Sequence, residues 1–485
     1  MKTLNKNIAQ KVERPIKIVQ FGEGNFLRGF VDYMVDVANE KGYFDGNIAI
    51  VKPIPHGSLE SFHNQDCNYT VLLRGQENGE KQVIKRIVTS VSEAVEPFSE
   101  YDRYVELAKL DSLRFIVSNT TEAGIVYDDS DRYELNPPKT YPGKLTKFLH
   151  DRFKHFNGDS SKGLVILPVE LIDDNGVHLK DAVLKLSNLW GLGEDFIAWL
   201  NEACIFGSTL VDRIVTGFPK DEADELWNEF GYRDELLVTG EPFALWVIET
   251  DKPIEDELPL HKAGLQVVFT DNHKPYKQRK VRILNGAHTS FSLASYLAGN
   301  DYVGESMKDE DISSYIRKTI FDEIIPTINL PMEDLVAFAD AVKDRFENPF
   351  IKHALLSISL NSVSKWRARC LPSLLDYVDK FSKLPNRLTF SLAALLQFYT
   401  GTEVGDGVLV GHRGDNTYEV KDNQEILEFF AAKSTGDIEQ FVTECLASES
   451  FWGQDLTKVA GLKDAVLGYL KDIRAIGIRE TIKKL

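Results

Sequence analysis

The feature that most constrains the fold of this chain is a buried strand pattern that runs directly into a glycine turn and a helical pattern. Ile16–Phe21 is an apolar run, Gly22 and Gly24 follow it, and helical periodicity continues through Val37. Glycine lets a backbone approach a pyrophosphate, and the start of a helix offers free N–H groups to it. The segment therefore predicts a parallel α/β domain that binds a dinucleotide.

The turn also gives a first set of expected cofactor contacts. A G-x-G pair alone is weak evidence, because ordinary tight turns use it freely. The third glycine of the usual G-x-G-x-x-G pattern is absent, since Leu27 stands there. Dinucleotide binding and a purely structural turn both remain open at this point. If the first is right, the contacting residues of the turn are Phe21, Gly22, Gly24, Asn25 and Phe26.

A later strand adds two residues to the same expected site. Leu113–Asn119 is a buried strand pattern, and the polar run Thr120–Gly124 follows it. Strand ends of this kind border the cofactor in open α/β sheets. We therefore expect Asn119 and Thr120 to contact the cofactor.

The strand pattern Asn47–Val51 leaves the choice between NAD and NADP open. An acid that binds the adenine ribose of NAD is expected after such a strand, but Lys52 and Pro53 follow. A lysine there can bind the 2'-phosphate of NADP or lie in solvent without a role. We expect a solvated Lys52.

Lys280, Asn285 and His288 bring an amine, an amide and an imidazole within about two helical turns. At about 100° per residue, His288 lies roughly 80° and Asn285 roughly 140° around the helix from Lys280. The three can then flank one small ligand, with the amide donating to a carbonyl oxygen and the imidazole positioning a hydroxyl. Lys280 lies near the middle of an apolar stripe formed by Ile283, Leu284, Ala287, Phe291 and Ala294.

Partial removal of the Lys280 ammonium from water disfavours its charged form and suits it to proton transfer. The alternative is an ordinary amphipathic helix, on which the same residues are a snorkelling cation, a surface amide and a satisfied histidine.

The two segments together resemble the polyol-specific long-chain dehydrogenases, the mannitol dehydrogenase family. The shared patterns are G-x-G-x-F-x-R at Gly22–Arg28 and K-x-x-x-x-N-x-x-H at Lys280–His288. The resemblance extends over nearly the whole chain. A branch of the family that acts on keto sugar acids shows the most specific resemblance. That resemblance lies in three segments, Phe21–Phe30, Ile166–Gly176 and Asn361–Arg369.

The resemblance implies a Rossmann-type N-terminal domain, a mainly α-helical C-terminal domain and a cleft that holds nicotinamide and substrate. It implies NAD as cofactor, Lys280 as the acid/base, and Asn285 and His288 as ligands of the reacting oxygen and its neighbours, with no metal. The implied reaction is reversible reduction of tagaturonate to altronate by NADH in hexuronate catabolism. Fructuronate reduction, a mannitol-type reaction and a non-catalytic nucleotide-binding protein remain alternatives.

Some positions depart from the family pattern. The mannitol enzymes carry an asparagine in the segment matching Val169–Leu171, where this chain has none, and this loss favours the non-catalytic alternative. Lys277 replaces a frequent glutamate, and Ser357 stands where an arginine is expected. Added cations suit a substrate that bears a carboxylate. We expect the substrate carboxylate to bind Lys365, Arg367 and Arg369. The alternative is that this basic cluster is a solvated face or part of a structural ion pair.

Composition sets the outer bounds. A chain of 485 residues exceeds one hydrophobic core, so we expect two domains, 1–274 and 275–485, divided near the turn-rich stretch Asn272–Pro275. A net charge of −18 disfavours nucleic acid and anionic membrane surfaces as partners. Four scattered cysteines, Cys67, Cys204, Cys370 and Cys445, show no metal-binding spacing.

No signal peptide or membrane-spanning run is visible in the sequence, so a cytoplasmic protein is expected. The sequence leaves the oligomeric state open. Gly401–Gly411 is rich in glycine but lacks the Gly-Lys-Ser/Thr ending of a phosphate-binding loop. We expect a surface loop there.

Overall fold

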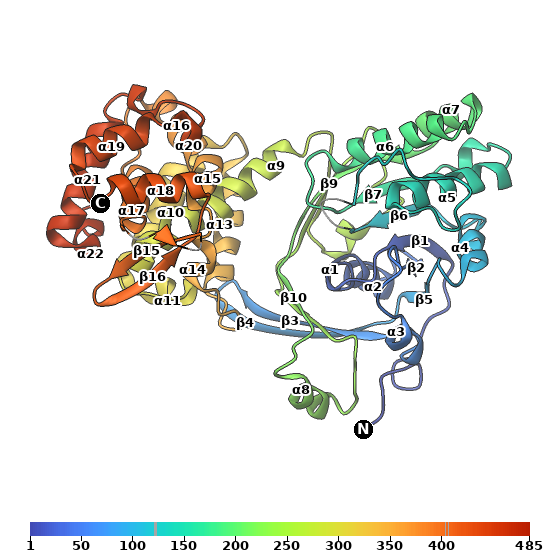
Figure 1. Ribbon diagram of the computed structural model, residues 1–485. Coiled ribbons are helices and arrows are strands. Elements are labelled where there is room, and N and C mark those ends of the chain that lie inside the picture. Colours follow the sequence, from blue (N-terminus) through green and yellow to red (C-terminus); the bar gives the residue numbers. More distant parts are fainter. Residues whose placement is uncertain (121–123, 403, 406) are drawn as a thin grey trace. The chain divides into compact units, whose positions relative to one another are not determined.

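A computed structural model describes residues 1–120, 124–402, 404–405 and 407–485 of the chain. The chain forms two compact units, both drawn in Figure 1. The first consists of residues 1–75 and 81–273, and the second consists of residues 76–80 and 274–485. The first unit is an α/β structure, and the second is mainly helical.

The first unit is built around a six-stranded sheet in which all neighbouring strands are parallel. The strand order reverses between β1 and β6, because the chain extends the sheet first on one side of β1 and then on the other. This is the expected Rossmann-type arrangement, and the predicted fold class is confirmed. In sheet order the strands are β5 (Val91–Val95), β2 (Asn47–Val51), β1 (Ile16–Phe21), β6 (Phe115–Ser118), β7 (Val165–Pro168) and β8 (Ile205–Phe206).

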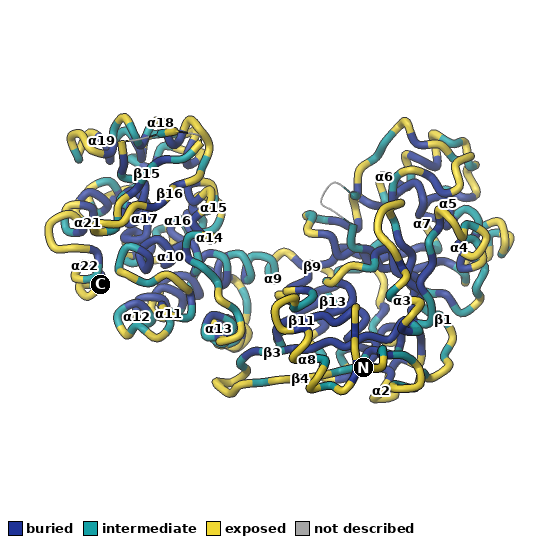
Figure 2. The backbone as a smooth tube through the Cα atoms, turned by 60° about the horizontal axis from the view of Figure 1, so that its bottom comes forward, coloured by how far each residue is buried: buried dark blue, intermediate teal, exposed yellow. Residues whose placement is uncertain are grey.

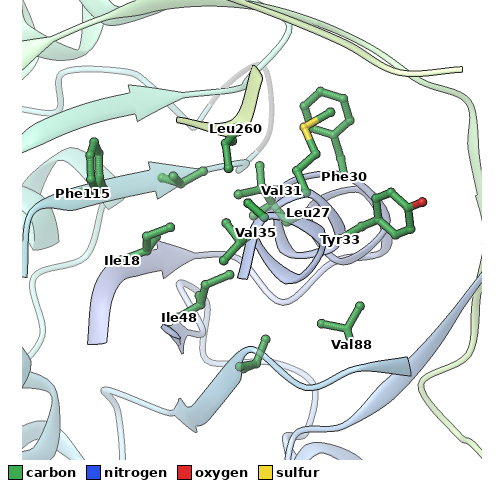
Figure 3. Close-up of a cluster of buried hydrophobic side chains, with 14 of the residues drawn as sticks. Ile18, Leu27, Phe30, Val31, Tyr33, Val35, Ile48, Val88, Phe115 and Leu260 are labelled. Atoms are coloured by element: carbon green, nitrogen blue, oxygen red, sulfur yellow. The ribbon is translucent and has the colours of Figure 1, made fainter. Parts of the chain in front are cut away.

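Both faces of this sheet are buried, as its continuous apolar strands require. On β1, Ile18 belongs to the core on one face, whereas Val19 and Phe21 belong to the core on the other. Figure 3 shows the first core, where Ile18 lies near Val35 of the helix that follows the glycine turn. In Figure 2 the central strands of the unit are dark blue along their length.

The helix after the glycine turn is not regular. It begins as α1 (Asn25–Leu27), passes through the π-helical turn η1 (Arg28–Asp32) and continues as α2 (Tyr33–Glu40). The predicted strand, turn and helix are confirmed, but the π-helical turn was not predicted. The other helices of the unit are α3 (Glu60–Asn64), α4 (Tyr101–Ala108), α5 (Tyr141–His155), η2 (Ser160–Lys162), α6 (Asn175–Leu189), α7 (Glu194–Glu202), α8 (Ala223–Phe230) and η3 (Leu260–Ala263).

Two smaller sheets pack against this helix. A Cβ added to Gly29 in η1 would meet methyl groups of Val215 and Val238 at 3.2 Å, so the glycine allows close packing of helix and sheet. The four-stranded sheet has the order β10 (Val215–Gly217), β11 (Val238–Gly240), β3 (Tyr69–Glu77) and β4 (Glu80–Val88). The three-stranded sheet has the order β13 (Val267–Thr270), β12 (Leu245–Glu249) and β9 (Ser208–Asp212).

The second unit is helical, with one small antiparallel sheet. Its first long helix is formed by α9 (Lys274–Arg279), η4 (Lys280–Gly286) and α10 (Ala287–Leu297). The remaining helices are α11 (Val303–Lys308), α12 (Glu310–Lys318), η5 (Thr319–Ile324), η6 (Ile325–Thr327), α13 (Met332–Phe346), α14 (Leu355–Ile358), α15 (Ser362–Arg369), α16 (Leu371–Phe381), α17 (Asn386–Phe398), α18 (Gln424–Lys433), α19 (Ile438–Ala447), α20 (Glu449–Trp452), η7 (Leu456–Lys458), α21 (Leu462–Ile476) and α22 (Ile478–Ile482).

The small sheet corrects one expectation. The stretch Gly401–Gly411, of which residues 403 and 406 lie outside the described part, is not simply a surface loop. Most of it enters the sheet of β14 (Val404–Gly405), β15 (Val408–Arg413) and β16 (Asn416–Val420). Leu409 is fully buried in the middle of the hairpin, so period-two burial overrode the glycine-rich composition.

The described residues contain no helix that is both long enough and apolar enough to cross a membrane.

Candidate active site

The first unit contains a pocket of about 870 Å³ at the carboxyl edge of its parallel sheet. Gly22, Pro53 and Asn119 line it, and they follow β1, β2 and β6 in the chain. The pocket therefore lies where the strand order reverses, between β1 and β6. In open α/β sheets this is the place where ligands bind.

The glycine turn is shaped for close approach of a ligand. Gly22 has a φ of +129°, and a Cβ there would meet Asn119 O and Leu27 Cδ1 at 3.1 Å. A side chain at Gly22 is thus disfavoured by both conformation and space. Gly24 lines the same pocket, and a Cβ there would have no atom within 4 Å. The open space above Gly24 fits the pyrophosphate of a dinucleotide, which must lie against the backbone.

Four of the seven residues expected to contact the cofactor line this pocket: Gly22, Gly24, Asn119 and Thr120. They are brought together by the adjacent ends of β1 and β6. Residues 121–123 of the polar run after β6 lie outside the described residues.

The other three residues expected to contact the cofactor are not among those that line the pocket. Phe21 is fully buried in the sheet core. Asn25 accepts a hydrogen bond of 2.7 Å from Arg28 Nη2 through its side-chain oxygen. Phe26 stacks on Phe30 with their ring centroids 5.0 Å apart. All three stabilise the turn and the helix that follows it.

Lys52 is not solvated, so the expectation for this residue is wrong. Its side chain has no exposed surface, and its Nζ donates to Glu96 Oε1 at 2.6 Å and to Gly57 O at 2.7 Å. The lysine folds back because parallel pairing of β2 with β5 brings Glu96 next to it. A buried ammonium requires such partners.

A long segment that lines the pocket was not identified from the sequence. Gly124 and residues 126–129 and 139–141 contribute to its wall, yet they show no periodicity. A usable signal was the start of α5, where the Thr140 side chain accepts from Gly143 N and a proline follows. Asp131 holds this start in place by accepting from the backbone N–H groups of Lys139 and Thr140 at 2.8 Å.

Glu170 also has a role at the pocket that the sequence did not indicate. Its carboxylate accepts from the backbone N–H of Thr120 at 2.9 Å and from the Thr120 hydroxyl at 3.0 Å. Ser118 donates to the same carboxylate at 3.2 Å. Burial raises the pKa of Glu170, and these donors oppose that shift. Glu170 therefore fixes the end of β6 at the pocket.

In the second unit, the predicted helix that carries Lys280, Asn285 and His288 is confirmed, but its regular pitch is not. Lys280 and Asn285 lie in the π-helical turn η4, and His288 lies in the first turn of α10. Angles of roughly 80° and 140° assumed an α-helical pitch, so they do not apply across η4. The predicted apolar stripe is buried throughout, and Lys280 and Asn285 are both partly exposed.

His288 lies among aromatic rings. Its ring centroid is 4.2 Å from that of Phe346 and 5.3 Å from that of His353. Its Nε2 is enclosed and has no hydrogen-bond partner among the described residues. Burial, together with the nearby His353, Arg345 and Arg369, holds the pKa of His288 well below its usual range. The imidazole is therefore neutral near pH 7.

The three expected carboxylate ligands do not share one environment. Lys365 and Arg369 are one turn apart on α15 and are both half-buried, whereas Arg367 is exposed on another side of the helix and packs against Gly453. Arg369 Nη1 donates to Thr289 Oγ1 at 3.4 Å, and Thr289 Oγ1 donates to Asn285 O at 2.9 Å. Arg369 is thereby tied to the segment that carries Asn285 and His288.

Gly286 explains how α15 comes so near. A Cβ at Gly286 would meet the backbone O of Arg369 at 3.1 Å, so a larger residue would separate the two helices. Burial and the neighbouring charge of Arg369 lower the pKa of Lys365. Neither cation has an ion-pair partner in the part of the chain that the structure describes. Two like charges held together in this way favour a bound anion.

The first unit has a pocket at the switch point of its parallel sheet. The second unit is helical and carries a lysine, an amide and a neutral imidazole on one helix. These features are typical of Rossmann-type dehydrogenases with a helical second domain. Family models agree with this class along most of the chain. The mannitol dehydrogenase Rossmann domain matches residues 16–262, and the mannitol dehydrogenase C-terminal domain matches residues 272–474. The chain belongs to the mannitol dehydrogenase family.

Individual relatives are also similar over the full length. Altronate oxidoreductases of Escherichia coli O7:K1 and Shigella flexneri are each 44% identical over 492 residues, with 100% of both chains covered. Among solved structures, mannitol 2-dehydrogenase of Pseudomonas fluorescens, in ternary complex with NAD and D-mannitol, matches with a TM-score of 0.65 and 21% identity over 100% of this chain and 99% of that one. A D-sorbitol dehydrogenase in substrate-free form matches with a TM-score of 0.78 and 22% identity over 99% and 100%. These two structures support the fold.

Proposed function

We propose that this protein reduces the ketone of tagaturonate to the secondary alcohol of altronate with NADH, and that it runs the reverse oxidation with NAD. The observation that carries the substrate assignment is the full-length similarity to altronate oxidoreductases. The switch-point pocket supports a dinucleotide cofactor, and the half-buried cations on α15 support an acidic substrate.

The cofactor pocket fits a dinucleotide in shape. Gly22 and Gly24 leave the backbone open to the pyrophosphate, and Asn119 and Thr120 face the pocket from the neighbouring strand end. Bound there, a nicotinamide cofactor supplies or accepts the hydride. Glu170 supports this binding indirectly, because it holds Thr120 in position.

The proton chemistry is assigned to the helix that contains η4. In the reduction, Lys280 gives one proton to the oxygen of the former ketone, so that hydride and proton together form the alcohol. Asn285 donates an amide hydrogen bond to the same oxygen as negative charge develops on it. His288 is neutral, and its imidazole positions a neighbouring substrate hydroxyl.

The carboxylate of the substrate is assigned to Lys365 and Arg369. An anion beside them relieves their mutual repulsion and forms charge-assisted hydrogen bonds. Arg367 is left out of this proposal, because it lies on another side of α15, against Gly453. The partner of this site is thus a small sugar acid.

A substrate panel tests the proposal. Purified protein is mixed with NADH and with tagaturonate, fructuronate or fructose, and the loss of NADH absorbance is followed. We expect the highest kcat/KM with tagaturonate. Faster reduction of fructuronate would assign the sibling reaction, and faster reduction of fructose would remove the role given to Lys365 and Arg369. Binding of NADH without turnover on any of the three would favour a non-catalytic protein.

A further inference from the structure

The corner of the sheet next to the cofactor pocket carries a partly buried ion pair that the proposed reaction does not use. Lys52 follows β2 at the position where dinucleotide-binding sheets of this type present the residue that meets the adenine ribose. The next two residues in the chain, Pro53 and Ile54, line the pocket itself. Any charge at this corner therefore lies close to the ribose 2' position.

Glu96 compensates the charge of Lys52. Its Oε1 is 2.6 Å from Lys52 Nζ, and its side chain is 26% exposed whereas that of Lys52 is 0% exposed. The pair is held by the sheet, because Lys52 N donates to Val95 O at 3.0 Å and so fixes the end of β2 beside the residue that precedes Glu96. The position of Glu96 is thus set by parallel pairing and not by a flexible contact.

The same ammonium fixes the loop that follows β2. Lys52 Nζ donates to Gly57 O at 2.7 Å, and Gly57 has a positive φ of +86° that suits glycine. The Pro53 to Ser58 loop is thereby tied to the end of β5. Lys52 donates inward to the protein on both of its observed bonds, so it does not present its charge to a ligand.

Glu100 adds a second carboxylate to this corner. Glu100 accepts from the backbone N–H of Glu96 at 3.1 Å and is exposed. With Lys52 neutralised by Glu96, the carboxylate of Glu100 adds a negative charge beside the pair. A 2'-phosphate carries close to two negative charges at neutral pH and needs a cation to receive it.

We propose that Glu96 is the residue that selects NADH over NADPH, by neutralising Lys52, the cation that follows β2, and drawing it away from the ribose corner. The selecting acid then lies at the end of β5 and not at the end of β2. The proposal rests on the proposed function, since it concerns the cofactor of that reaction, but it concerns only the adenosine half of the cofactor.

A charge series at the pair tests this. Glu96→Gln keeps an oxygen that accepts from Lys52 but leaves the ammonium uncompensated. Lys52→Met leaves the carboxylate uncompensated, and the double variant returns the pair to zero charge. We expect the ratio of kcat/KM for NADPH to that for NADH to rise at least tenfold in Glu96→Gln. The ratio should fall in Lys52→Met and return to within about threefold of wild type in the double variant.

A binding experiment provides a readout that does not depend on turnover. Calorimetry with ADP-ribose and with 2'-phospho-ADP-ribose measures the same preference on the free protein. We expect the Kd of the phosphorylated ligand to fall at least tenfold in Glu96→Gln, with the Kd of ADP-ribose changed less than threefold. Glu100→Gln, which alters an exposed charge at the same corner without freeing Lys52, should move the ratio of the two Kd values much less.

Unchanged ratios in a folded Glu96→Gln variant that still binds ADP-ribose would overturn the proposal. If that variant does not fold, the Lys52→Met variant decides, since a ratio equal to wild type there would also overturn it. Absence of turnover in the wild-type protein would defeat the proposed function and leave the binding ratios able to test the role of Glu96.

Discussion

The chain contains a π-helical turn in each of its two assigned sites, and the two turns differ in what they expose. In η1, next to the glycine turn, every residue from Arg28 to Asp32 is buried. In η4, Lys280 and Asn285 are partly exposed. The first turn keeps polar groups inside the protein, and the second directs them outward.

The buried contacts of η1 show what this turn does. Asp32 Oδ2 accepts from the Tyr69 hydroxyl at 2.5 Å and from Gln20 Nε2 at 3.4 Å. The same Gln20 amide donates to Gly22 O at 3.1 Å. Asp32 is therefore connected through Gln20 to the glycine turn, and the side chains of η1 position a backbone.

In η4 the roles are reversed, because the backbone positions side chains. Arg282 forms an ion pair of 2.6 Å with Asp376 and donates to Thr327 O at 3.2 Å, which anchors the buried side of the turn. Lys280 and Asn285 lie toward its more exposed side. The glycine turn before η1 thus offers backbone N–H groups and open space to a ligand, whereas η4 offers the side chains of Lys280 and Asn285. Substitutions should therefore separate cofactor binding from chemistry.

The largest effect is expected for Lys280→Ala. Loss of a general acid or base typically costs about 10²- to 10⁴-fold in rate. We expect kcat for tagaturonate reduction to fall by roughly 10³-fold, with the Kd of NADH nearly unchanged, as measured by stopped-flow absorbance and fluorescence titration. Lys274→Ala, in the preceding helix, is the control and should keep most of the activity. An unchanged kcat with a raised KM would make Lys280 a binding residue only.

Gly22→Ala should act on the other region. An alanine would strain the backbone at a φ of +129°, and its Cβ would meet Asn119 O at 3.1 Å. Strain of about 1–3 kcal/mol should weaken NADH binding about tenfold or more and lower the melting temperature. Gly24→Ala is the matched variant, because a Cβ there meets nothing within 4 Å but enters the pocket. It should weaken NADH binding at an unchanged melting temperature, and equal losses of stability in both variants would contradict this assignment.

Arg369→Met sharpens the assignment of the substrate carboxylate. Loss of a charge-assisted hydrogen bond of about 1.5–3 kcal/mol should raise KM for tagaturonate roughly 10- to 100-fold. Arg367→Met removes the same charge from the same helix, and we expect a change below about threefold. Similar KM values in the two variants would show that only the general field of α15 matters.

Asp32→Asn tests the buried network of η1 through stability. Burial raises the pKa of Asp32 from 3.8 to about 7. The folded protein therefore holds this proton more tightly than the unfolded chain, and stability falls as pH rises from about 4 to about 7. This loss of stability is complete above that pH range. It amounts to at most about 4 kcal/mol, because one proton contributes about 1.4 kcal/mol for each pH unit. The asparagine removes this pH dependence.

Urea unfolding at about pH 5 and about pH 8 measures the difference in unfolding free energy between Asp32→Asn and wild type. We expect this difference to favour the variant more at about pH 8 than at about pH 5. Tyr69→Phe removes the hydroxyl that donates to Asp32 and lowers its pKa, so this variant should show a larger total loss of stability as pH rises. A stability difference between Asp32→Asn and wild type that is the same at both pH values would show that Asp32 is ionised in the folded protein.

The sequence predicted the central sheet well, because its strands are continuous apolar runs. Ile16–Phe21 and Asn47–Val51 coincide with β1 and β2. The glycine turn was also predictable, since its conformational demand is local. Gly22 and Gly24 line the pocket for this reason.

Other features depend on contacts between distant residues, and no local pattern contains them. The pairing of Lys52 with Glu96 arises only when β2 and β5 lie side by side. The pocket wall around Lys139 to Tyr141 is placed by hydrogen bonds to Asp131. The π-helical pitch of η4 cannot be read from a 3.6-residue period, so the trio was predicted but its angular spacing was not.

The central claim is that the protein moves a hydride between nicotinamide and the ketone of a hexuronate. The most direct measurement is mass spectrometry of the product formed from tagaturonate and NADH that carries deuterium at the transferable position. The account predicts altronate that is one mass unit heavier, with deuterium on the carbon that was the ketone, and almost none of this product from Lys280→Ala. Consumption of tagaturonate without deuterium in the product, or NADH that binds and is never oxidised, would contradict it.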